Sequence, residues 1–140
     1  MQYKGFRDLT VYKKAYRLAL DIFKSSKQFP AFERYSLTDQ IRRSSRSVAA
    51  NIAEAWPKRL YEKLFTSTLI RAAGEASETG YWLDMALELQ YLNQDKHKDM
   101  LARCIEVEKM LWSMIHYPGR FTCDLNRDGR RSDKNEQTKC

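Results

Sequence analysis

The sequence predicts an all-α protein, an up-down-up-down antiparallel four-helix bundle followed by a polar C-terminal tail. Apolar residues recur at steps of three and four in four successive segments, and short segments with Pro or Asn separate them. The 140 residues include only five Gly and three Pro, too few for a sheet with many turns. Amphipathic helices joined by short loops bury their apolar faces against one another. We predict the bundle over residues 1–118 and the tail over 119–140.

The first helix is expected from Asp8, a candidate N-cap, to about Lys27, and it ends before Pro30 because the residue preceding a proline avoids the helical conformation. It carries two adjacent apolar rows, a wider arc than one core contact needs. The second row therefore either forms a subunit interface or packs beneath a terminal segment. The two rows are Val11, Ala15, Leu18 and Ile22, and Tyr12, Tyr16, Ala19 and Phe23.

The second helix is expected to begin at Ser36, with Asp39 completing a capping box, and to end near Trp56, just before Pro57. Its buried stripe should consist of Leu37, Ile41, Ser44, Val48, Ile52 and Ala55. Small residues flank this stripe and would let another helix approach closely. These are Ser45, Ser47, Ala49, Ala50 and Ala53.

The third helix is expected from about Arg59 to Gln90. Two features are predicted along it: Gly74 and Gly80 at close helix contacts, and an exposed ion pair between Arg71 and Glu75. Its core stripe should be Tyr61, Phe65, Thr68, Ala72, Ala76, Thr79, Leu83 and Ala86. The fourth helix follows Asn93 and runs to about Tyr117, before Pro118-Gly119. Its core stripe should be Met100, Cys104, Val107, Leu111 and Met114.

Catalytic and metal-binding patterns are missing from this sequence. The two histidines, His97 and His116, are preceded at three residues by Gln94 and Ser113, so the Glu-x-x-His pairs of di-iron bundles do not occur. No glycine-rich phosphate loop, Cys-x-x-Cys pair or nucleophile elbow is present. We therefore expect no enzyme activity, no metal and no cofactor. The carboxylates Glu54, Glu75 and Glu78 are expected in structural ion pairs with arginine rather than in acid–base chemistry.

Positive charge is the main functional signal. The formal net charge is +7 and the pI about 9.4, which makes an anionic partner plausible. Arg42, Arg43 and Arg46 lie almost opposite the buried stripe of the second helix. Other basic residues in positions to extend this face are Lys13, Lys14, Arg17, Lys58 and Arg59. Two interpretations remain open: guanidinium groups that bind phosphates, or a solvated face paired with neighbouring carboxylates.

The location is expected to be cytoplasmic. Cys104 lies within an apolar helical pattern, and Cys123 and Cys140 are predicted to be free thiols, which favours a reducing compartment. Residues 1–9 do not resemble a signal peptide, and no apolar run approaches the roughly 20 residues of a membrane span. No membrane partner is expected.

The order of residues also resembles the 23S rRNA-intervening-sequence protein family over roughly Phe6 to Ile115. The specific segments are Q-I-R-R at Gln40 to Arg43 and N-I-A-E at Asn51 to Glu54, and further matches are Asp8-Leu9, Val11-Tyr12, Lys14-Ala15, Phe29-Pro30, Glu33, Tyr35, Leu37 and Ser47-Val48. The resemblance implies a four-helix bundle that assembles as a homopentamer and has no established enzymatic activity. Family members are similar to accessory proteins of diversity-generating retroelements, which bind nucleic acid and a reverse transcriptase.

The resemblance assigns Arg42 and Arg43 to the family's paired arginines, and it makes Gln40, Asn51, Glu54 and Glu78 structural motif residues. Two departures concern turns: Ser36 stands where the family has glycine, and Ala55-Trp56-Pro57 replaces the glycine after N-I-A-E. The function expected is non-enzymatic binding of RNA or DNA through arginine-rich outer faces. The alternative is a protein-interaction scaffold or an accessory subunit of a reverse transcriptase.

Overall fold

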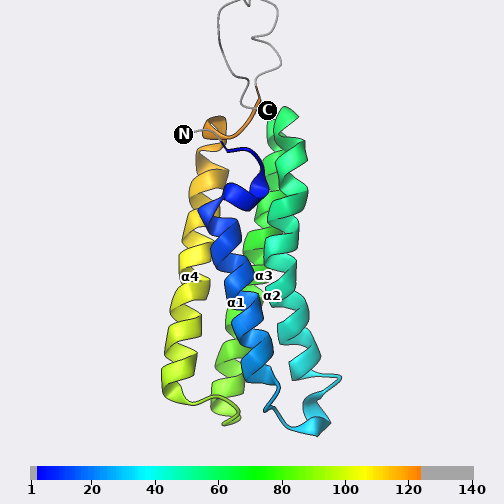
Figure 1. Ribbon diagram of the computed structural model, residues 1–140, viewed down its shortest axis with the longest axis vertical. Helices are drawn as coiled ribbons and strands as arrows, with labels where there is room; N and C mark the ends of the chain where they lie inside the picture. Colours follow the sequence, from blue (N-terminus) through cyan, green and yellow to red (C-terminus); the bar gives the residue numbers. More distant parts are fainter. Residues whose placement is uncertain (1–2, 124–140) are drawn as a thin grey trace, which may run out of the picture.

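Four antiparallel helices form the fold of this chain (Figure 1). The structure is a computed structural model that describes residues 3–123, and its long helices are α1 (Thr10–Ser26), α2 (Leu37–Ala55), α3 (Glu62–Glu88) and α4 (Gln94–His116). Helix α2 packs against α1 and α3, and α4 packs against α3 and α1, so the four helices surround one core. Residues 3–123 contain no β-strand. The predicted fold class is confirmed.

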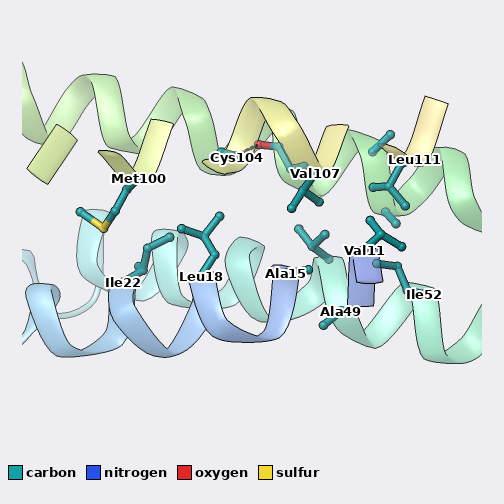
Figure 2. Close-up of a cluster of buried hydrophobic side chains, with 14 of the residues drawn as sticks. Val11, Ala15, Leu18, Ile22, Ala49, Ile52, Met100, Cys104, Val107 and Leu111 are labelled. Carbon is teal, nitrogen blue, oxygen red and sulfur yellow. Dashed lines mark hydrogen bonds between the residues drawn. The ribbon is translucent and has the colours of Figure 1, made fainter. Parts of the chain in front are cut away.

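The predicted apolar stripes form the core. Every residue of the first apolar row of α1 and of the stripes of α2 and α4 is buried, and so is every stripe residue of α3 except Tyr61, which is 59% exposed at the N-cap. Side chains from α1, α2 and α4 meet along the bundle axis in Figure 2, where Ile22, Leu18 and Val11 lie opposite Met100, Val107 and Leu111. Burial of a leucine- or isoleucine-sized side chain contributes about 1.5–3 kcal/mol. Periodicity therefore identified the core correctly.

Of the predicted N-caps, the one at Asp8 is wrong, and the one at Ser36 is correct in position but lacks its side-chain hydrogen bond. The N-cap of α1 is Leu9 rather than Asp8, because the Asp8 carboxylate accepts a hydrogen bond from the Lys4 backbone N–H at 2.7 Å. Ser36 does occupy the N-cap position of α2, but its hydroxyl donates to Glu33 Oε1 at 2.7 Å, and no capping box forms with Asp39. In both cases a local loop contact uses the side chain that the cap would need.

The remaining helix boundaries lie near the Pro and Asn residues that predicted them. Helix α2 ends at Ala55, where a 3₁₀ segment (Trp56–Leu60) containing Pro57 begins. Asn93 caps α4 as expected, because its side-chain oxygen accepts the Lys96 N–H at 2.8 Å. Just before it, Gln90 has a φ of 65°, the left-handed conformation that ends many helices.

Two predictions for α3 are not confirmed. A Cβ on Gly74 would meet nothing within 4 Å, and one on Gly80 would make only an ordinary 3.6 Å contact with Leu101, so contacts within this chain require neither glycine. Glu75 pairs with Arg43 of α2 instead of Arg71. A residue on the adjacent helix therefore replaces the partner predicted one turn away.

The chain remains packed beyond the predicted bundle boundary at residue 118. A 3₁₀ turn (Pro118–Arg120) leads to Phe121, whose ring lies 5.9 Å from that of Tyr3 and 6.4 Å from that of Phe65. The Cys123 N–H then donates to the Arg59 carbonyl at 2.9 Å. The rest of the predicted tail, residues 124–140 with Cys140, lies outside the described residues.

The cysteines differ in their environments. Cys104 is buried as predicted, and its thiol donates to the Ala76 carbonyl at 3.0 Å. Burial, with smaller contributions from Glu108 and Asp84, raises the pKa of this thiol to about 12. The prediction of a free thiol at Cys123 is wrong, because Cys123 is disulfide-bonded.

None of the helices in residues 3–123 has the length and apolar character that a membrane span needs.

Candidate nucleic-acid interface

The three arginines of α2 do not form one patch, because they have different neighbours. Arg43 faces α3, where its Nη2 donates to both carboxylate oxygens of Glu78 at 2.8 Å and its Nη1 lies 3.5 Å from Glu75 Oε1. Its Nε also lies 3.5 Å from Gln40 Oε1. Arg43 is therefore held by two carboxylates within the bundle, as expected for Glu75 and Glu78.

The electrostatics of this pair agree with its geometry. The hydrogen bond to Glu78 is the main cause that raises the pKa of Arg43. Burial favours a higher pKa for the Glu78 carboxyl, but hydrogen bonds from Arg43 and from the Trp82 indole outweigh it, and the pKa of Glu78 falls below its ordinary value. Each partner thus favours the charged form of the other. Arg43 stays charged, but two carboxylates beside it offset that charge locally.

Arg42 and Arg46 face α1 instead, and both lie over the ring of Phe23. The Arg42 Cζ is 4.7 Å from the ring centroid and the Arg46 Cζ is 5.6 Å from it. A third cation, the ammonium of Lys27 at the C-cap of α1, lies 5.1 Å from the same centroid. We call Lys27, Arg42 and Arg46 the cation cluster.

The cation cluster is held by neutral groups. Arg42 Nε donates to the Ser26 hydroxyl at 2.7 Å, and the hydroxyl itself donates to the Phe23 carbonyl at 2.9 Å. The π-face of a phenyl ring attracts cations without neutralising them. Within residues 3–123, no carboxylate lies within 4.0 Å of any of the three charged groups. Three like charges that lack counter-charges form a site suited to an anion.

The other predicted basic residues are not drawn into this cluster. Lys14 pairs with Glu106 of α4 at 2.6 Å, and Lys58 lies 3.4 Å from Glu54 and 3.3 Å from the Thr68 hydroxyl. Arg59 packs over the Trp56 ring at 3.6 Å, and burial lowers its pKa. The last two predicted basic residues, Lys13 and Arg17, lie at exposed positions of α1.

The predicted motif residues act within the bundle. Besides the contacts of Gln40, Glu54 and Glu78 given above, the Asn51 amide donates to the Ser47 carbonyl one turn earlier at 2.8 Å. This bond lies along α2 itself and points to a structural role. None of the four forms a hydrogen bond or ion pair with a member of the cation cluster.

An apolar groove between α1 and α2 adjoins the cation cluster. It measures about 980 Å³, including the part open to solvent, and Arg46 and Phe23 line the end nearest the cluster. The other lining residues are Phe6, Tyr12, Tyr16, Ala19, Leu20, Ala49, Ala50 and Ala53. The second apolar row of α1 thus has two environments: Tyr12 packs against Phe6 of the N-terminal segment at 5.0 Å, whereas Tyr16 remains 53% exposed.

Lys27 and Phe23 belong to the site but were not among the predicted site residues. Their i, i+4 spacing on α1 places them on one face and was a usable signal. Their approach to α2 was not visible, because it depends on how the two helices pack.

The two histidines lie away from the cation cluster in their contacts. His97 Nε2 lies 2.8 Å from Asp84 Oδ1, and His116 lies beside Trp112. The described residues contain no group of His, Cys, Asp and Glu that could hold a metal ion.

The fold and the surface define an all-helical bundle in which Lys27, Arg42 and Arg46 form a cation cluster between α1 and α2. The chain matches the 23S rRNA-intervening sequence protein family over residues 7–113, and it belongs to that family. A crystallised protein of unknown function from the S23 ribosomal protein family of Bacteroides thetaiotaomicron is similar to it, with 29% identity and a TM-score of 0.69 over 76% of this chain and 95% of that one. No match is found among curated proteins.

Proposed function

We propose that this protein is a non-enzymatic homo-oligomer that binds the phosphate backbone of RNA or DNA. The single observation that supports it is the cation cluster, in which Lys27, Arg42 and Arg46 share one aromatic ring and have no carboxylate within 4.0 Å in the described part of the chain. Salt-bridged arginines elsewhere on the bundle, such as Arg43, lack this property.

The physical basis is the release of counterions from nucleic acid. Each phosphate that a lysine or arginine neutralises frees condensed cations, which favours binding and makes it weaken as salt rises. Arginine in addition forms bidentate bonds to phosphate oxygens. Such contacts are independent of sequence, and several copies of the cluster in one oligomer would strengthen them through multivalency.

The test compares a double variant that removes the two arginines of the cation cluster with a variant that removes the salt-bridged Arg43. We expect Arg42→Gln with Arg46→Gln to weaken binding of an RNA oligonucleotide about tenfold or more at low salt, while Arg43→Gln changes it little. Fluorescence anisotropy measures the affinities, and circular dichroism checks the fold. Because the double variant removes two charges and Arg43→Gln removes one, a loss in log affinity for Arg43→Gln that is half or more of the loss in the double variant would show that net charge matters and the cluster does not.

We place subunit contacts at the apolar groove between α1 and α2. Exposed Tyr16 and Leu20 and the alanines Ala49, Ala50 and Ala53 suit the close approach of a helix from a second copy. A homopentamer is the assembly that the family resemblance implies. Light scattering of purified protein should give a mass several times that of one chain, and Tyr16→Glu should reduce it. A monomeric parent protein would contradict this part of the proposal.

The same groove supports a second candidate function, an accessory subunit of a reverse transcriptase or another protein-interaction scaffold. Apolar exposed surface beside positive charge is also what a polypeptide partner would bury. Affinity purification from the native cell separates the two. A single stoichiometric protein partner would favour the scaffold, whereas co-purifying RNA that high salt removes would favour nucleic-acid binding.

A further inference from the structure

Two aromatic rings protrude from the connection between α1 and α2. Phe32 is 79% exposed and Tyr35 is 84% exposed, the two largest values among the exposed large hydrophobic residues of the described chain. Both belong to the loop at the lower end of the bundle in Figure 1, where the chain passes from α1 to α2. Packing of the core does not explain them, because most of each ring contacts no protein atom.

The loop that carries these rings is firmly held. Its 3₁₀ turn (Ala31–Glu33) and the turn that follows contain consecutive backbone bonds: Glu33 N–H to the Pro30 carbonyl at 3.0 Å, Arg34 N–H to Ala31 at 3.1 Å and Ser36 N–H to Glu33 at 3.0 Å. Phe29, two residues before the 3₁₀ turn, is buried, and its ring lies 5.7 Å from that of Tyr91. The exposed rings are therefore presented on a preorganised backbone.

The two rings belong to consecutive turns of one short loop. Phe32 lies in the 3₁₀ turn (Ala31–Glu33), and Tyr35 lies three residues later in the turn that follows it. The rings of Phe32 and Tyr91 form a T-shaped pair with centroids 6.5 Å apart, and the Arg34 guanidinium lies 5.3 Å from the Tyr35 centroid. Flat apolar surfaces here alternate with a guanidinium plane, a second surface on which bases stack.

Positive charge lies at the same end of the bundle. Lys27 follows the last residue of α1, two positions before Phe29, and Arg42 contacts Ser26 in that last turn. The nearest loop acid, Glu33, is engaged by the Ser36 hydroxyl at 2.7 Å and by Tyr91. A polyanion bound at the cation cluster would thus pass close to the exposed rings.

We propose that Phe32 and Tyr35 stack on unpaired bases, so that this end of the bundle selects single-stranded over double-stranded nucleic acid. The inference rests on the proposed function, because the cation cluster supplies the backbone contacts. In a duplex the base faces are stacked on one another and hidden from protein rings, whereas a single strand exposes them. Every base has a π-face, so the preference is for strandedness and not for sequence.

The test uses a uridine-rich RNA of about 12 nucleotides, within the usual range of site sizes, and a duplex of the same length. Phe32→Ala with Tyr35→Ala should weaken binding of the single strand by about fivefold or more, the loss expected for one or more stacked bases. Affinity for the duplex and the salt dependence should stay unchanged. Tyr61→Ala is the matched control, since Tyr61 is 59% exposed at the junction of α2 and α3, the opposite end of the bundle.

A 2-aminopurine base in the single strand gives a second readout, because its fluorescence is quenched when it stacks. Quenching by the parent protein and by Tyr61→Ala, but not by the double variant Phe32→Ala with Tyr35→Ala, supports stacking. Unchanged affinity and quenching in the double variant would overturn it, and so would equal losses for single strand and duplex. Failure of the parent to bind either RNA would instead contradict the proposed function, so the two failures are distinguishable.

Discussion

Replacement of Glu78 by glutamine tests whether Arg43 belongs to the bundle and not to the nucleic-acid surface. Glutamine keeps the size of the side chain and can still accept one hydrogen bond, but it removes the charge that Arg43 Nη2 contacts at 2.8 Å through both oxygens. The pair joins α2 to α3. Its loss should lower the free energy of unfolding without changing the fold.

The magnitude follows from exposure. The side chains of Arg43 and Glu78 are 46% and 34% exposed, so solvent screens their attraction, and the coupling should be about 0.5 kcal/mol, within the range for surface ion pairs. Because the pKa of Glu78 is lower in the folded state than in the unfolded chain, the contribution is fully present above the unfolded value, about 4.3. It is lost as the pH falls through the lower, folded value.

Urea denaturation of a double-mutant cycle measures this coupling. The cycle combines Glu78→Gln with Arg43→Gln, and each of the four proteins is unfolded at neutral pH and below pH about 3. We expect a favourable coupling at neutral pH that becomes much smaller in acid. A coupling near zero at neutral pH would refute our assignment of Arg43 to the bundle, and one that persists in acid would refute the charge-based explanation.

Three further predictions concern stability and reactivity. Because the thiolate is the nucleophile, the pKa of about 12 at Cys104 predicts that iodoacetamide at pH about 8 will not modify this residue in the native protein. Mass spectrometry should find its peptide modified only after denaturant is added. Rapid labelling of native protein would contradict the burial. Leu83→Ala, at a fully buried position, should cost about 2–5 kcal/mol in urea denaturation, and a cost below about 1 kcal/mol would contradict close packing there. Asn93→Ala removes the cap of α4 and should cost about 1 kcal/mol, whereas an equal cost for exposed Gln94→Ala would argue against the cap.

The four helices and the core could be predicted from the sequence because both depend on local periodicity. A residue such as Ile52 or Leu111 lies on the apolar stripe of its own helix wherever the neighbouring helices stand, and both are buried. The side-chain caps expected at Asp8 and Ser36 do not form, for a different reason. Asp8 and Ser36 can bond to several nearby groups, and the choice depends on loop conformations, which pattern alone does not determine.

The candidate site could be predicted only in part. A helical projection places Arg42, Arg43 and Arg46 within about 100° of one another on α2, which led to the expectation of a single arginine face. The helices on either side decide the outcome: α3 supplies two carboxylates to Arg43, whereas α1 supplies Phe23 to Arg42 and Arg46. Those contacts join residues far apart in sequence, so no local pattern reveals them.

The salt dependence of RNA affinity tests the central claim most directly. Each phosphate contact contributes about 0.7 to the slope of log affinity against log salt for a single strand. If Lys27, Arg42 and Arg46 each neutralise one phosphate, replacing all three by glutamine should make the slope shallower by about two, while Arg43→Gln should leave it unchanged. An unaltered slope in the triple variant, with the fold intact, would contradict binding at the cation cluster.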